Sequence, residues 1–104
     1  MKELLFSKTI SCKYLDTADE EIEKAVMCDN FGFALSARIL DAYEESYNNK
    51  VSDSVIDSID CTIHHTHYVF VDKDLTVHVF VNEFHNDKFD NVVSVFVFRD
   101  RKWR

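Results

Sequence analysis

The spacing of apolar residues changes near residue 60 of this chain, and that change decides the fold class. Before it, apolar side chains recur every three to four positions over much of the chain, which is the period of an amphipathic helix. After it, they recur at every second position in three segments, "IDCTIHHTHYVFVD", "LTVHVFVNEF" and "NVVSVFVFRD". This alternation, rich in Val, Phe and Ile, predicts three β-strands.

The chain before residue 60 is predicted to begin with a strand. Residues 3–14 alternate between apolar and polar side chains, and only Leu5 and Lys8 break the pattern. The apolar side would consist of Leu4, Phe6, Ile10, Cys12 and Tyr14. This pattern is typical of a strand with one buried face.

Two helices are predicted to follow. "TADE" matches a capping box, in which Thr17 begins a helix and Glu20 reaches back to it. That helix is expected to end at about Asn30, and Gly32 in "NFG" to form a left-handed cap. The second helix should reach about Asn48. The two apolar faces would consist of Ala18, Ile22, Ala25 and Val26, and of Leu35, Ile39, Ala42, Tyr43 and Tyr47.

These elements predict a single α+β domain over residues 1–104. Two N-terminal helices would pack on one face of an antiparallel sheet of three to four strands, in the order β-α-α-β-β-β. One glycine and no proline favour long elements with few tight turns. Residues 50–58, "KVSDSVIDS", fit either a short helix or the start of a strand, and the sequence leaves both open.

The first two strands of the second half are expected to form a hairpin around Lys73 and Asp74. With these as the two turn residues, Val69 would lie opposite His78, and His67 opposite Phe80. The face toward the helices would carry Tyr68, Phe70, Leu75, Val77, Val79 and Val81. The other face would carry His65, His67, Val69, Thr76, His78 and Phe80.

The histidine-bearing face allows three interpretations. Two histidines on one strand and a third on its neighbour resemble the ligand set of carbonic anhydrases and, loosely, of cupins; that resemblance implies a metal site at His65, His67 and His78. The histidines could instead be partly exposed sheet residues. The third interpretation is a homodimer that covers His65, His67, His78 and Phe80, and that loosens as pH falls toward about 6. The register places no carboxylate on this face to orient an imidazole, so no metal or other cofactor is predicted.

The net charge of −7 comes from the first part of the chain. Residues 1–60 carry thirteen acidic and six basic residues, whereas residues 61–104 carry six of each. The acidic residues of the two helices include Asp19, Glu20 and Glu23, and Asp41, Glu44 and Glu45. A surface of one sign attracts basic partners and repels bare nucleic acid; the alternative is that it only keeps the protein in solution.

The C-terminal segment "RDRKWR" is the most basic feature of the chain. Arg and Trp are over-represented among interface hot spots, so Arg101 and Trp103 are candidate partner-binding residues. The alternative is a strand end whose charges balance the acidic helices or a frayed terminus.

Several functional classes lack their motifs. The single glycine excludes a P-loop and a dinucleotide-binding loop, and there is no G-x-S-x-G element. Cys12, Cys28 and Cys61 are scattered without a CxxC pair, which predicts reduced, mostly buried thiols. There is no apolar run long enough to span a membrane and no signal-peptide core, so a cytoplasmic location is expected.

These observations favour a binding protein over an enzyme. The acidic helices would occupy the basic, nucleic-acid-binding surface of a partner protein, as a phage anti-defence inhibitor of the anti-CRISPR kind or an immunity protein against a nuclease toxin would do. A small metal- or histidine-dependent enzyme is one alternative. A homodimeric structural or regulatory subunit is the other.

Overall fold

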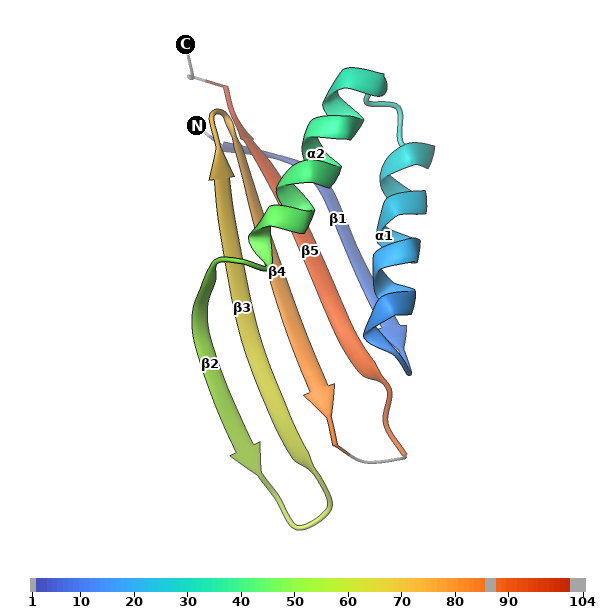
Figure 1. Ribbon diagram of the computed structural model, residues 1–104, viewed down its shortest axis with the longest axis vertical. Coiled ribbons are helices and arrows are strands. Elements are labelled where there is room, and N and C mark those ends of the chain that lie inside the picture. Colours follow the sequence, from blue (N-terminus) through green and yellow to red (C-terminus); the bar gives the residue numbers. More distant parts are fainter. Residues whose placement is uncertain (1, 86–87, 102–104) are drawn as a thin grey trace.

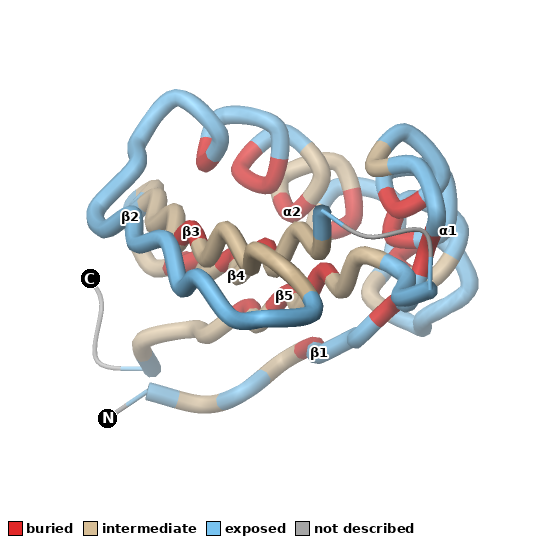
Figure 2. The backbone as a smooth tube through the Cα atoms, turned by 90° about the horizontal axis from the view of Figure 1, so that it is seen from below, coloured by how far each residue is buried: buried red, intermediate tan, exposed pale blue. Residues whose placement is uncertain are grey.

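Two helices lie on one face of a five-stranded antiparallel sheet in the computed structural model, which describes residues 2–85 and 88–101 (Figure 1). The chain forms β1 (Lys2–Cys12), α1 (Leu15–Cys28), α2 (Phe33–Ser46), β2 (Lys50–Asp57), β3 (Thr62–Asp72), β4 (Leu75–Phe84) and β5 (Asn91–Asp100). The edge-on view in Figure 2 places both helices on the same side of the sheet. The predicted arrangement of two helices on an antiparallel sheet is therefore confirmed.

The sheet has one strand more than predicted, and the element order is β-α-α-β-β-β-β. Its strand order is β1-β5-β4-β3-β2, so the N-terminal and C-terminal strands are neighbours. The additional strand is β2, the segment that the sequence left open. All eight of its residues are exposed. Because β2 buries neither face, apolar and polar residues are not expected to alternate along it. It is an edge strand, and the strand it pairs with is β3.

The predicted hairpin is confirmed in register. Val69 pairs with His78, and His67 pairs with Phe80. The pair Asp72–Leu75 closes the hairpin, which leaves Lys73 and Asp74 as the turn residues. Lys73 has a φ of +55°, a left-handed conformation that suits a tight hairpin but is unfavourable for a lysine.

The core lies between the helices and the inner face of the sheet. The central strands β4 and β5 supply Leu75, Val77, Val79, Val81, Val93, Val95 and Val97, and β1 supplies Phe6, Ile10 and Cys12. The helices supply Ala18, Ile22, Val26, Ile39, Ala42 and Tyr43. The apolar faces predicted for both helices are thus the ones that pack. In β1 the register shifts between Leu4 and Phe6, and this irregularity explains the break in alternation at Leu5 but not the one at Lys8.

The helix boundaries differ from those predicted. The capping box is wrong: α1 begins at Leu15, its N-cap is Tyr14 without a side-chain cap, and Thr17 lies inside the first turn. Leu15 packs against the core, and this packing outweighs the cap signal two residues later. Gly32 has a φ of +82°, but it stands before α2 as its N-cap and does not end α1.

Asp74 connects three elements at the end of the β3–β4 hairpin. Its carboxylate accepts hydrogen bonds from Arg38 of α2 at 2.7 Å and from Arg99 of β5 at 2.9 Å. The Arg38 hydrogen bond, with that of Arg99, holds the pKa of the Asp74 carboxyl below its usual value. The hairpin turn thereby anchors both the second helix and the last strand.

Cys12 is buried, but Cys61 is half-buried and Cys28 is exposed, so the three free thiols are less buried than expected. No helix within residues 2–85 and 88–101 combines the length and hydrophobicity needed to cross a bilayer.

Candidate functional site

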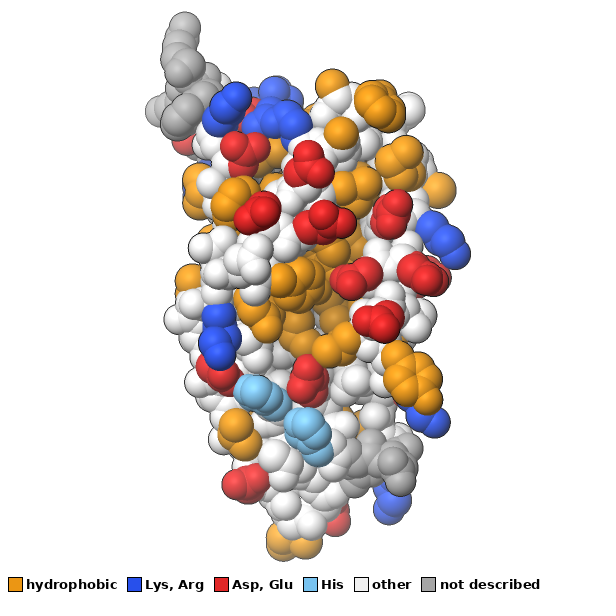
Figure 3. Space-filling view, viewed as in Figure 1, with side chains coloured by type: hydrophobic (Ala, Val, Ile, Leu, Met, Phe, Trp, Pro, Cys, Tyr) orange, Lys and Arg blue, Asp and Glu red, His pale blue; other side chains and the backbone are white. Residues whose placement is uncertain are grey.

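An acidic groove lies between the two helices on the outer side of the molecule. It encloses about 240 Å³ and is lined by Asp19, Glu23, Leu40, Tyr43, Glu44 and Tyr47. Figure 3 shows red carboxylates around an orange hollow between α1 and α2. We call this feature, defined by those six residues, the acidic groove. Its rim is negative, and its walls include an aliphatic side chain and two aromatic rings.

Hydrogen bonds fix the tyrosines of the acidic groove. Tyr43 donates to Asp19 Oδ1 at 2.6 Å, which links α2 to α1. Because Tyr43 has one hydroxyl proton and donates it to Asp19, its oxygen accepts the 2.8 Å hydrogen bond from Tyr47. Burial raises the pKa of Tyr47 to about 12. Burial and the bond to Asp19 raise the pKa of Tyr43 still further. Both hydroxyls therefore remain protonated donors at neutral pH.

The acidic groove contains three of the six predicted acidic residues: Asp19, Glu23 and Glu44. Glu20 lines a shallow depression on the other side of Glu23, together with Lys24 and Met27. Asp41 and Glu45 do not line the groove. Sequence reasoning found the carboxylates but not the groove, because the groove depends on how the two helices pack.

The structure describes the basic C-terminal segment as far as Arg101. Arg101 forms a two-pronged ion pair with Glu3 of β1, with Nη2 2.9 Å from Oε1 and Nε bonded to Oε2. Its guanidinium thus pairs within the chain, but with β1 and not with the acidic helices that the alternative interpretation named. Trp103 lies outside the described residues.

Histidine and aromatic side chains lie on the sheet face opposite the helices, which we call the open sheet face. It carries the predicted residues His65, His67, His78 and Phe80. His67 stacks on Phe80 with ring centroids 4.1 Å apart, and its Nε2 lies 3.1 Å from Nδ1 of His78. Phe96 and Phe98 of β5 meet Phe80 and His78 edge-on at 5.9 Å and 5.8 Å. Within the part of the chain that the structure describes, no element lies over this face (Figure 2).

The open-face histidines bond to neighbours and not to a common centre. His67 and His78 share a hydrogen bond, and Nδ1 of His65 is bonded to Asn82 Oδ1. Burial lowers the pKa of both His67 and His78, and the neighbouring histidines lower it further. The resemblance to a three-histidine ligand set is therefore limited to the residue types and their strands.

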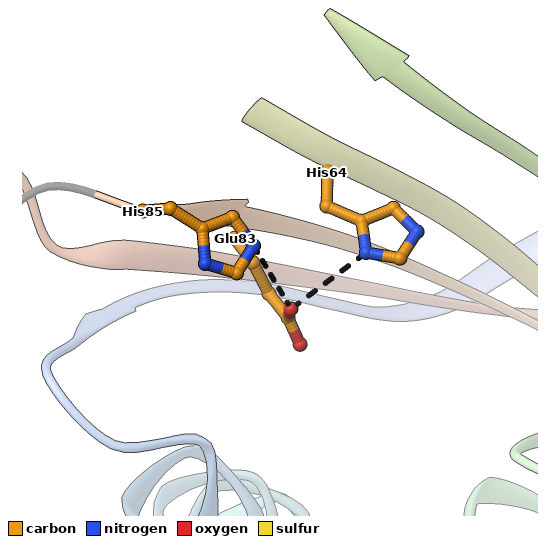
Figure 4. Close-up of side chains that lie close together, drawn as sticks. All are labelled: His64, Glu83 and His85. Carbon is orange, nitrogen blue, oxygen red and sulfur yellow. Dashed lines mark ion pairs between the residues drawn. The ribbon is translucent and has the colours of Figure 1, made fainter. Parts of the chain in front are cut away.

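A third cluster lies on the helix side of the sheet, where the strands extend beyond the helices. His64 of β3, Glu83 of β4 and His85 just after β4 each offer a ligand atom, all within 4.8 Å of one another. Figure 4 shows both imidazoles directed toward the Glu83 carboxylate. Sequence reasoning missed this cluster, although the hairpin register places Glu83 opposite His64.

Comparison with known proteins adds no relative. No family model, no curated protein and no solved structure matches this chain. The function must therefore be inferred from the three surfaces described above: the acidic groove, the open sheet face and the His64–Glu83–His85 cluster.

Proposed function

We propose that this protein is a binding protein whose acidic groove captures a basic segment of a partner protein. The observation that carries the proposal is the groove itself, in which Asp19, Glu23 and Glu44 surround Leu40 and the two tyrosines. Scattered surface acids would favour any cation, whereas carboxylates around an apolar hollow favour a cation with an aliphatic or planar body.

Lysine and arginine side chains match this combination. Their stems can pack on Leu40 and the tyrosine rings while the charged head reaches the carboxylates of the rim. An arginine can also stack on an aromatic ring and bond a carboxylate with two donors. The groove is preorganised, because the Tyr47–Tyr43–Asp19 hydrogen bonds already hold its wall in place.

The partner class follows from charge. A protein surface rich in Lys and Arg is usually one that handles nucleic acid, and a protein of net charge −7 would compete with nucleic acid for it. We therefore propose an inhibitor of a nucleic-acid-handling protein, in the setting of phage anti-defence (anti-CRISPR) or of nuclease-toxin immunity. Binding of this kind is fast and weakens with salt.

Paired charge reversals test the groove. The chain would be used to capture partners from a nuclease-treated lysate, and the affinity for the captured basic protein would then be measured against salt. Glu23→Lys/Glu44→Lys should weaken binding by at least tenfold. The matched control is Glu21→Lys/Asp41→Lys, which changes one exposed residue on each helix outside the groove by the same charge. Equal losses in both variants would contradict a role for the groove.

The open sheet face supports a second candidate function, that of a homodimeric subunit. Its central residues are His67, His78, Phe80, Phe96 and Phe98, which form one aromatic cluster on an uncovered face. Aromatic faces of this kind are often covered by another protein surface. Light scattering at micromolar concentration and neutral pH is the test, and a monomer would exclude the dimer.

A further inference from the structure

The His64–Glu83–His85 cluster is arranged as a set of metal ligands. Glu83 Oε2 lies 3.9 Å from Nδ1 of His64 and 3.9 Å from Nε2 of His85. In a tetrahedral zinc site with bonds of about 2.0–2.1 Å, ligand atoms are about 3.3 Å apart. These two separations need to shrink by roughly half an ångström, and the separation between the two histidine nitrogens, which is within 4.8 Å, by at most about 1.5 Å; side-chain rotation can supply both.

The orientation of His64 is set by a second carboxylate. Nε2 of His64 is bonded to Asp53 Oδ1 on the neighbouring strand β2, and Lys50 holds the other oxygen of Asp53 at 2.9 Å. Because a carboxylate only accepts, Nε2 carries a proton, which leaves Nδ1, on the Glu83 side, as the nitrogen that can ligate an ion. A ligating histidine commonly has such a carboxylate behind it, which fixes the tautomer and raises the basicity of the ligand.

We propose that His64, Glu83 and His85 bind a Zn²⁺ ion. Two imidazoles and one carboxylate suit zinc, whereas Mg²⁺ and Ca²⁺ prefer sites built from oxygen ligands. His64 and Glu83 pair across β3 and β4, so the hairpin register fixes them. His85 follows the end of β4. Its backbone N–H donates to the Thr62 carbonyl at 2.9 Å, so its position is also fixed by β3.

Three protein ligands leave the fourth position of the ion open. The site is accessible, because His85 is 57% exposed and His64 and Glu83 are each 34% exposed. Glu83 also lines a shallow pocket of about 190 Å³ that shares Asp19 and Tyr47 with the acidic groove. The open position is therefore available to water or to a donor atom of a molecule seated beside the groove. The zinc site does not depend on the function proposed for the groove.

Titration of the full, tag-free chain with ZnCl₂ tests the site, with calorimetry and the Co²⁺ d–d spectrum as readouts. One ion per chain is expected, with a strong preference over Mg²⁺. His64→Gln/His85→Gln should weaken zinc binding by at least about 100-fold, and Asp53→Asn by about 10–100-fold. The matched control, His67→Gln/His78→Gln on the opposite face, should bind as the wild type does.

Each alternative outcome overturns the proposal. Absence of zinc binding by the folded wild-type chain would do so directly. Unchanged binding in His64→Gln/His85→Gln would place the ion elsewhere, and loss confined to His67→Gln/His78→Gln would place it on the open face. Circular dichroism of each variant separates loss of a ligand from loss of the fold. None of these measurements involves a partner protein, so they fail or succeed independently of the groove.

Discussion

The hydroxyl of Tyr43 donates a 2.6 Å hydrogen bond to the Asp19 carboxylate and so joins the two helices across the acidic groove. Tyr43→Phe removes this bond and leaves the Tyr47 hydroxyl without its acceptor. A hydrogen bond to a charged group contributes about 1.5–3 kcal/mol, and Asp19 regains water at its exposed end, so a loss of about 1–2 kcal/mol in the free energy of unfolding is expected. Urea denaturation measures it. Asp19→Asn, which keeps an acceptor, should lose less; an unaltered free energy in Tyr43→Phe would contradict the bond.

The same two tyrosines make the fold sensitive to alkali. Their pKa values are raised in the folded chain, Tyr47 to about 12, whereas an unfolded tyrosine loses its proton near pH 10. Above pH 10 the unfolded state therefore holds fewer protons than the folded state, and stability falls as pH rises. Chemical denaturation between about pH 9 and 11 should show this decline. A double variant, Tyr43→Phe/Tyr47→Phe, should show a flatter profile, and an identical slope would refute the assignment.

The open-face histidines have the opposite pH dependence. The pKa values of His67 and His78 are lowered by burial, with further contributions from His65 on His67, and from His67 and Lys2 on His78. The unfolded chain takes up protons first as pH falls below about 6.5, so stability present at pH 7 and above is lost toward pH 5. His67→Phe/His78→Phe should reduce this loss. Urea denaturation at pH 5 and at pH 7 measures the loss, and an equal loss in the double variant would contradict this assignment.

Two carboxylates that bind arginine differ in burial and should therefore contribute differently to the free energy of unfolding. The side chain of Asp74 is 11% exposed and bonds Arg38 and Arg99, whereas that of Glu3 is 44% exposed and bonds Arg101. Asp74→Asn should cost about 1–3 kcal/mol of unfolding free energy, and Glu3→Gln should cost less, because solvent screens its ion pair. Because the pKa of Asp74 is lowered in the fold, its contribution should also disappear as pH falls through and below about 4. Similar costs for both variants at neutral pH would contradict this ranking.

The sequence predicted the parts of the fold that bury one face. Alternation in β3 and β4 predicted the hairpin and its register, and helical spacing predicted which sides of α1 and α2 pack. The segment β2 buries neither face, so its sequence carried no periodic signal, and it became a strand only because β3 offers it a free edge.

The candidate sites were less predictable for a related reason. Acidic residues on the helices were visible in the sequence, but helix packing decided that Glu23 and Glu44 share a groove and that Asp41 does not. His64 was not among the predicted site residues; in a strand it alternates with His65 and His67 and so lies on the same side as Tyr68, which faces the helices. The sheet extends past the helices there, so that side is open to solvent and to Glu83.

The turn at Lys73 offers a test of backbone strain that is independent of any site. A left-handed conformation costs a non-glycine residue about 1–2 kcal/mol, whereas glycine adopts it freely but loses about 0.5–1 kcal/mol more backbone entropy on folding. With φ at +55°, Lys73→Gly should therefore raise the free energy of unfolding by up to about 1 kcal/mol. Lys73→Val should lower it, because a β-branched residue tolerates this conformation least. Urea denaturation of both variants provides the measurement. If valine were as stable as glycine here, the turn would not hold residue 73 in the left-handed region.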